Sequence, residues 1–219
     1  MKILVSIIVI LALVQSIQAQ NIGVFVGVNT MNNYPFQKSN EHYYTSFSPK
    51  IGYSIGVEFD DIKIATIPIK FTGKVVNYNG DISHENSGLG GGYELDISQE
   101  NYCLSIGLHL INNKSSSPLQ LSLGIEYSIL LSEKFNGRAK TWSMSTGVEN
   151  KLIYENSFKL NTTKKIAIIG MIGYKKEIAT DLYIEPQFSV LVGITKELQI
   201  FEPVRTLKYL LEIGISKNI

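Results

Sequence analysis

Three histidines are the residues of this chain best suited to metal or acid–base chemistry. His42 and His84 fall in long segments expected outside a membrane, and His109 falls in a segment expected to be a strand. No two of them have the spacing of roughly three to five residues that places two zinc ligands on one element. The sequence therefore predicts no metal site and no cofactor.

Ser105 and His109 are the best pair for nucleophilic catalysis, because alternation gives both the same parity in one expected strand. Four residues of strand span about 13 Å, which is too far for a nucleophile and its base. We expect both side chains, with Cys103 of the same parity, to fill the interior of a barrel. The chain is therefore not expected to be an enzyme.

Two other features invite a functional interpretation. The glycine-rich stretch 88–92 has no lysine–serine pair and no following helix, so we expect an external loop there, not a phosphate-binding loop. Phe135 and Trp142 fall in the long third external segment, where an aromatic side chain is a candidate for contact with lipid or a partner. Chance placement explains these aromatics at least as well.

The overall composition limits the function classes. The 219 residues carry 20 Lys and Arg against 19 Asp and Glu, so there is no net field to attract nucleic acid, and no nucleic-acid partner is expected. One cysteine excludes an intramolecular disulfide, so stability must come from backbone pairing and packing.

The amino terminus is typical of a targeting segment. Met1 and Lys2 precede an apolar run, residues 3–14, and a polar stretch ends at Ala19. The run is shorter than the roughly 20 residues of a membrane-spanning helix, which favours a cleavable signal peptide, residues 1–19. We expect a mature domain of residues 20–219, exported through the inner membrane.

Apolar residues alternate with small or polar residues in eight segments, which is typical of strands with two unlike faces. The segments are 22–29, 50–59, 62–72, 102–111, 119–131, 164–174, 182–192 and 207–219. The connections between them are alternately long and short, as in outer-membrane barrels with tight periplasmic turns and long external loops. The sequence predicts an all-β protein, an eight-stranded antiparallel up-and-down transmembrane β-barrel.

Two places depart from regular alternation. The two residues between segments 50–59 and 62–72, Asp60–Asp61, are expected to form a short turn. Within segment 62–72 the apolar face changes side near Ala65, so we expect a β-bulge beside Pro68. Residues 93–97 and 152–160 also have an extended pattern. A ten-stranded barrel is the alternative, but we place both stretches in external hairpin extensions.

The composition of the second face indicates what surrounds the barrel. That face is rich in Gly and Ser, such as Gly52, Ser54 and Gly124, which suits the narrow interior of eight strands. A soluble lipocalin-like barrel would instead carry Lys, Glu, Thr and Gln there. We therefore expect the apolar face to contact outer-membrane lipid, which places the protein in the outer membrane.

Alternation places seven charged side chains inside the barrel. They are Glu58, Glu126, Glu185, Glu212, Lys50, Lys70 and Lys208. An unpaired charge in a confined interior costs several kcal/mol, so we predict a structural network of Glu–Lys pairs, completed by hydroxyls and water.

Several segments together resemble the PorT-like outer-membrane β-barrel proteins of Bacteroidetes, over residues 20–219. The resemblance rests on "QAQ", "IGVFVGVN", "PLQLSLGIEYSILL", "IAIIGMIGY" and the closing "YLLEIGISKNI". It departs from the usual barrel ending, because Ile219 stands where an aromatic residue is commonest. The resemblance implies an accessory role in secretion or cell-envelope assembly, with other envelope or secretion proteins as partners.

Three functions are compatible with these patterns. The first is a membrane scaffold or interaction protein. The second is a lipid-active outer-membrane enzyme, which needs a catalytic group at the rim. The third is a secreted ligand-binding barrel of the lipocalin kind, which needs an apolar interior.

Overall fold

A computed structural model describes most of the chain after the amino-terminal segment. The described residues are 21–35, 43–64, 67–88, 90–112, 117–143, 147–153, 163–195 and 204–219. None of them belongs to a helix long and apolar enough to cross a membrane. The expected signal peptide, residues 1–19, lies outside the described residues.

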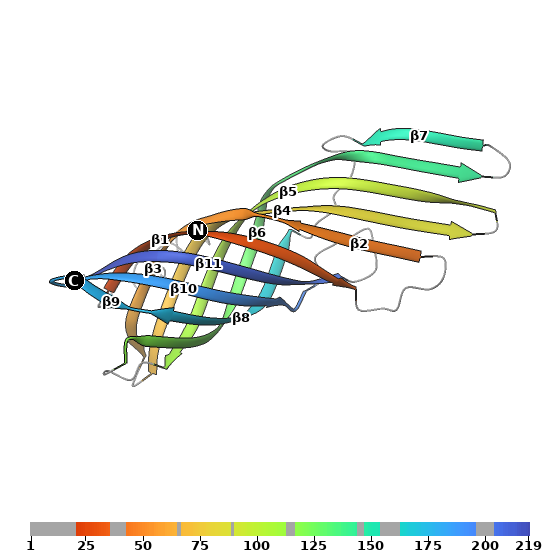
Figure 1. Cartoon of the computed structure of the whole chain (residues 1–219). Coiled ribbons are helices and arrows are strands. Elements are labelled where there is room, and N and C mark those ends of the chain that lie inside the picture. Colours follow the sequence, from red (N-terminus) through yellow and green to blue (C-terminus); the bar gives the residue numbers. More distant parts are fainter. Residues whose placement is uncertain are drawn as a thin grey trace, which may run out of the picture.

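The described elements are all β-strands (Figure 1). They are β1 (Asn21–Pro35), β2 (Tyr43–Lys50), β3 (Gly52–Ile64), β4 (Ile67–Gly88), β5 (Gly91–Asn112), β6 (Leu119–Ser143), β7 (Gly147–Ile153), β8 (Lys164–Tyr174), β9 (Lys176–Ala179), β10 (Leu182–Gly193) and β11 (Val204–Asn218).

Eight of these strands close into a ring. Their order is β11-β1-β3-β4-β5-β6-β8-β10, and β10 pairs with β11 from Leu182↔Lys217 to Val192↔Leu207. Every pairing is antiparallel. Ring closure leaves no open sheet edge in this part of the molecule, as a bilayer requires. The predicted all-β barrel is confirmed.

Three strands continue beyond the ring and form a second region. β4, β5 and β6 have 22, 22 and 25 residues, so each reaches about 70 Å or more at roughly 3.3 Å per residue, against a hydrocarbon core of about 30 Å. Past the last β3–β4 pair, Ser54↔Val76, β4 pairs with β2, while β6 pairs with β7. We call β2, β7 and residues 77–88, 91–102 and 132–143 the extension.

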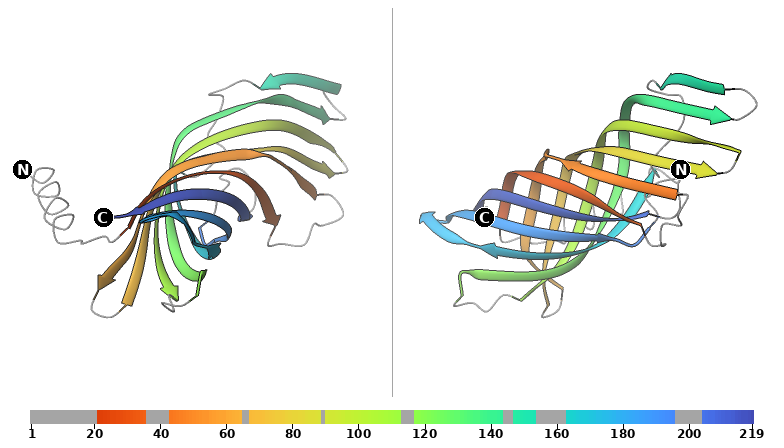
Figure 2. Two further views of the ribbon diagram at one scale, coloured as in Figure 1. Left: turned by 60° about the vertical axis from the view of Figure 1, so that its left-hand side comes forward. Right: turned by 45° about the vertical axis from the view of Figure 1, so that its right-hand side comes forward.

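The extension lies at the end of the molecule away from the carboxyl terminus (Figures 1 and 2). In both views of Figure 2 its strands continue those of the barrel as one curved sheet. The short connections, which are periplasmic in barrels of this kind, lie at the opposite end, so the extension is external.

The extension corrects several expected loops. The predicted connection between segments 62–72 and 102–111 is the far part of the β4–β5 hairpin. Residues 93–97 belong to β5 within this hairpin extension, as predicted. At the glycine-rich stretch, where an external loop was expected, Gly88 pairs with Gly91 at the end of this hairpin, and Gly91 has φ 149°. The sequence pattern underestimated the length of these strands because their outward face becomes polar beyond the barrel.

The second extended stretch also lies outside the ring. β7 contains residues 152–153 and pairs with β6 only, within the described part of the chain, and residues 154–160 fall outside it. Neither stretch adds a strand to the barrel.

The expected turn at Asp60–Asp61 is also wrong. β3 continues to Ile64, and its pairing with β4 shifts register between Phe59 and Ile62, so these two aspartates form an irregularity within the strand. Pro68 instead pairs with Lys63 in regular register. The apolar face changes side because the two halves of segment 62–72 belong to different strands.

Candidate functional site: the filled lumen and the outer face of the extension

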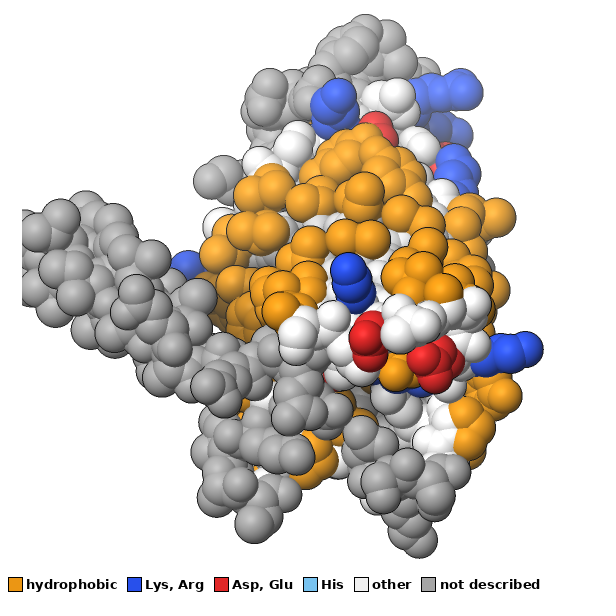
Figure 3. Space-filling view, turned by 90° about the vertical axis from the view of Figure 1, so that its left-hand side faces the viewer, with side chains coloured by type: hydrophobic (Ala, Val, Ile, Leu, Met, Phe, Trp, Pro, Cys, Tyr) orange, Lys and Arg blue, Asp and Glu red, His pale blue; other side chains and the backbone are white. Residues whose placement is uncertain are grey.

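The outside of the barrel is an apolar belt. Its exposed side chains include Ile22, Val24, Val26 and Val28 of β1, Leu104, Ile106, Leu108 and Leu110 of β5, and Leu121, Leu123 and Ile125 of β6. Figure 3 shows hydrophobic side chains over a wide area of one face, with charged side chains in small groups beside it. Exposed apolar area on this scale requires lipid around it.

A pair of tyrosines lies where the belt meets the extension. The Tyr53 hydroxyl donates to the Tyr102 hydroxyl at 3.2 Å, and Tyr102 donates to Glu100 Oε1 at 2.7 Å. Such amphipathic rings mark a boundary between lipid and water. The protein is an outer-membrane barrel, and its predicted location is confirmed.

Inside the barrel, one buried lysine forms ion pairs with carboxylates of two other strands. Lys70 Nζ on β4 lies 2.7 Å from Glu58 Oε2 on β3 and 2.9 Å from Glu185 Oε1 on β10. Gln187 Nε2 donates to the same Glu58 oxygen at 3.0 Å. The three charged side chains are almost completely buried, so their desolvation is offset by direct pairing across the lumen.

A second group surrounds Lys74. Its Nζ lies 2.9 Å from Glu126 Oε2 and 3.9 Å from Glu212 Oε1. The Ser54 hydroxyl donates to Glu212 at 2.8 Å, and the Ser128 hydroxyl donates to Glu126 at 3.3 Å. Hydroxyl groups therefore donate one hydrogen bond to each of these carboxylates, as in a connected polar network.

The structure buries six of the seven charged side chains that alternation placed inside. These are Glu58, Glu126, Glu185, Glu212, Lys70 and Lys208. Lys208 Nζ lies 4.6 Å from the centre of the Tyr78 ring. Lys50 is a correction: it ends β2, is half exposed on the extension, and donates to Asp81 Oδ1 at 2.6 Å. It lies outside because the barrel strand begins only at Gly52.

Sequence reasoning missed three buried charges. Lys74 shares the parity of Lys70, so the signal was present, but the expected strand ended at residue 72. Lys165 was not singled out in its strand, although it shares the parity of buried Ala167. Asp60 had been assigned to a turn, and it accepts from Lys175 Nζ at 2.9 Å and from Asn21 Nδ2 at 2.9 Å.

The residues considered for nucleophilic chemistry have structural contacts. Ser105 and His109 are both buried, and the Ser105 hydroxyl lies 2.7 Å from the Ser128 hydroxyl. His109 contacts Thr72 at 3.3 Å and Ser122 at 3.5 Å. Each side chain is thus engaged by a different set of neighbours.

Apolar side chains cover the external end of the network. Val76 and Tyr78 follow Lys74 on the inward face of β4, and they pack with Met31 and Cys103. A second cluster joins Ala167, Ile169, Leu191 and Leu210. The lumen is therefore a packed interior of charged, polar and apolar layers, as eight strands require.

Phe135 has a different role from the one considered for it. Its side chain is buried with Ile82, Leu95 and Ile97 in a cluster on the inward face of the extension. It stabilises the sheet there and is not a lipid anchor.

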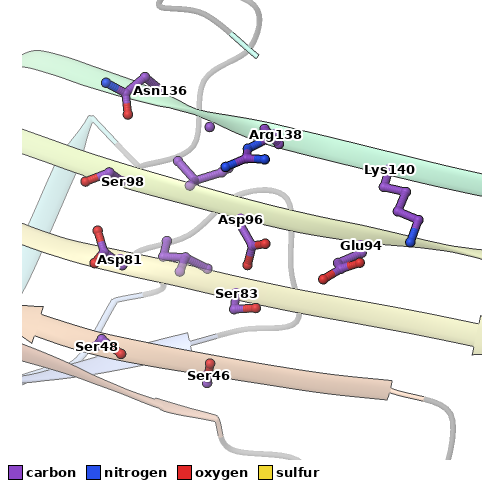
Figure 4. Close-up of a pocket in the computed structure, with 13 residues that line it drawn as sticks. Ser46, Ser48, Asp81, Ser83, Glu94, Asp96, Ser98, Asn136, Arg138 and Lys140 are labelled. Atoms are coloured by element: carbon purple, nitrogen blue, oxygen red, sulfur yellow. The ribbon is translucent and has the colours of Figure 1, made fainter. Parts of the chain in front are cut away.

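The outward face of the extension holds a polar hollow of about 760 Å³. The side chains labelled in Figure 4 lie on one side of the sheet. They are Ser46 and Ser48 of β2, Asp81 and Ser83 of β4, Glu94, Asp96 and Ser98 of β5, and Asn136, Arg138 and Lys140 of β6. The hydrogen bond from Lys50 holds the pKa of Asp81 below its usual range, so this carboxylate is ionised at neutral pH.

These features define a class: a small outer-membrane barrel with a filled lumen and an external sheet. No known family model matches the chain, and no curated protein does. In fold, it is similar to neisserial surface protein A (14% identity, 90% of this chain and 97% of that one, TM-score 0.40). It is also similar to the attachment invasion locus protein Ail of Yersinia pestis (10%, 91% and 99%, 0.41) and to OprG of Pseudomonas aeruginosa (10%, 92% and 97%, 0.47).

Proposed function

We propose that this protein is a non-conducting membrane scaffold that presents the extension to other proteins of the cell envelope. The observation that carries the proposal is the contrast between the charged side chains of the lumen and the polar outward face of the extension. In the lumen, charged side chains form ion pairs with one another, as Lys70 does with Glu58 and Glu185. The extension instead offers a large polar sheet to the outside.

The edge of the extension supports a protein partner. β7 pairs with β6 and, among the described residues, with no other strand. Its outer edge therefore carries backbone groups suited to pairing with a strand of another chain. Val148 is an exposed apolar residue of this edge strand.

The resemblance to PorT-like barrels gives the scaffold a biological setting. An accessory role in secretion or cell-envelope assembly follows from that resemblance, with envelope or secretion proteins as partners. A catalytic role is not part of the proposal, because Ser105 and His109 contact structural hydroxyls and not each other.

A photo-crosslinking residue in place of Val148 tests the scaffold directly. In intact outer membranes we expect protein adducts from position 148 and only lipid adducts from the matched position Ile125 in the belt. If several positions along β7 gave no protein adduct, the scaffold would be the wrong function. In planar bilayers we expect no stable conductance, and reproducible open channels would also contradict the proposal.

A further inference from the structure

The polar hollow lies on the same side of the sheet as the lipid belt. On β5 the outward residues are first Leu108, Ile106 and Leu104, then Tyr102 at the boundary, and then polar side chains that lead to Ser98 in the hollow. Alternation is unbroken along this strand, so the hollow continues the membrane-facing surface of the barrel. Its nearest environment on this side is the external leaflet.

The position along the strand matches the polar part of that leaflet. Ser98 is six residues beyond Leu104, about 20 Å of strand, which is at most roughly 15 Å of height at a tilt of about 40°. The headgroup zone adds only about 5 to 8 Å on each side of the hydrocarbon core. The hollow therefore begins above the headgroup zone, at the level of the sugars and phosphates that the head of a large glycolipid carries there.

The charges of the hollow are mixed and nearly balanced. Asp81 is already paired with Lys50 at 2.6 Å. In the strand register Asp96 is opposite Arg138, yet no carboxylate of the described residues forms an ion pair with this guanidinium. The cation at Arg138 is thus available to a ligand, and a purely acidic or purely basic partner would meet like charge.

The lining chemistry selects a ligand with both hydroxyl and phosphate groups. Serine hydroxyls, an amide and carboxylates exchange hydrogen bonds with sugar hydroxyls. A guanidinium and a nearby ammonium bind phosphate through charge-assisted hydrogen bonds. In the hollow these cations are Arg138 and Lys140, which lie on the same face of β6.

We propose that the hollow binds the head of a phosphorylated glycolipid of the external leaflet, with Arg138 and Lys140 on its phosphate and the side chains of β2, β4 and β5 on its sugars. The belt below the hollow receives the acyl chains of the same molecule. This inference does not depend on which protein contacts β7.

The test uses the full-length mature protein in nanodiscs of phosphatidylethanolamine with a small fraction of rough-type lipopolysaccharide. Wild type is compared with the double variant Arg138→Gln and Lys140→Gln. A matched control, Lys176→Gln and Lys217→Gln, removes two exposed lysines at the periplasmic end. Circular dichroism and heat-modifiable migration in SDS check that all three proteins are folded.

The amount of glycolipid retained after detergent extraction is measured by mass spectrometry. We expect the Arg138 and Lys140 variant to retain about tenfold less than wild type, and the control to retain the wild-type amount. Equal retention by the two variants would overturn the proposal. Glycolipid adducts from a photo-crosslinking residue at Ser98 support it, and exclusively protein adducts there overturn it while leaving the scaffold function intact.

A competition measurement with a soluble oligosaccharide distinguishes binding of the glycolipid from binding of a free saccharide. The delipidated oligosaccharide is expected not to displace the bound glycolipid, because it lacks the acyl chains that the belt receives. Full displacement at equimolar concentration would show that the hollow serves a free saccharide and would overturn the glycolipid assignment.

Discussion

The barrel and the extension share β4, β5 and β6 but have opposite polarity. In the barrel, Ile125 of β6 is 57% exposed to the outside and Glu126 beside it is 1% exposed. In the extension, Phe135 of the same strand is buried on the inward face, and Arg138 is exposed on the outward face. Along one sheet, the outward face therefore changes from apolar to polar, and the inward face changes from polar to apolar.

The change occurs where the surroundings change from lipid to water. The hydrogen-bonded ladder between β4 and β5 continues without interruption from Ile69↔Leu110 to Gly88↔Gly91, whereas the β5–β6 pairing shifts register between Tyr102 and Cys103, at the boundary. Side chains respond to the solvent that each face contacts, while the ladder only fixes which residues share a face. Three pairs of substitutions, each with one member in the barrel and one in the extension, test this difference.

The largest difference is expected for the two kinds of lysine–carboxylate pair. Lys70→Met leaves Glu58 and Glu185 buried without their cation, at a cost of about 3 to 5 kcal/mol. Lys50→Met breaks an exposed pair with Asp81 and costs at most about 1 kcal/mol. Urea unfolding from lipid vesicles measures both. Equal losses would mean that the lumen is hydrated like the surface.

A charge added to the outward face of β6 is the second test. Ile125→Lys places an ammonium in the lipid belt and costs about 2 to 4 kcal/mol near the middle of the bilayer. Asn136→Lys has the same outward orientation in the extension and is expected to change stability by less than about 0.5 kcal/mol. The same unfolding measurement applies, and a comparable loss at position 136 would place the extension inside the bilayer.

Deletion of one methyl group gives a smaller contrast. Ile97→Val opens a space in the buried cluster with Ile82 and Phe135, at a cost of about 0.5 to 1.5 kcal/mol. Ile106→Val is expected to cost less, because lipid chains take up the space outside the barrel. Amide hydrogen exchange along β5 resolves the two regions. The reverse ranking would show that the cluster in the extension is loosely packed.

The smallest effect is a pH dependence confined to the extension. Burial lowers the pKa of His84, whose ring centre is 5.1 Å from that of Tyr93. The folded extension thus favours the neutral ring, so this stability is present above the ordinary pKa of 6.5 and is lost as the pH falls below it. Hydrogen exchange near residue 84 is expected to accelerate on acidification, and His84→Leu should abolish the acceleration. Persistence of the pH dependence in that variant would assign it to another group.

The sequence by itself determined which residues of the barrel strands face lipid and which face the lumen. Alternation with period two is a local property, and it is readable wherever one face contacts lipid and the other a narrow polar interior, as at Ile125 and Glu126. The eight alternating segments also predicted the number of strands in the ring. These patterns also placed six of the seven expected charges in the lumen.

Only the tertiary structure decided how far the strands continue and which charges meet. The sequence predicted only two short stretches of the extension, residues 93–97 and 152–160. Lys74 was missed because the expected strand ended at residue 72, although this lysine binds Glu126 in the lumen. Lys50 has the parity of the luminal residues in segment 50–59, but it belongs to β2, where it pairs with Asp81. Partners on strands far apart in the chain depend on barrel closure and register, and these are set by the pairing of all strands together, which no local pattern contains.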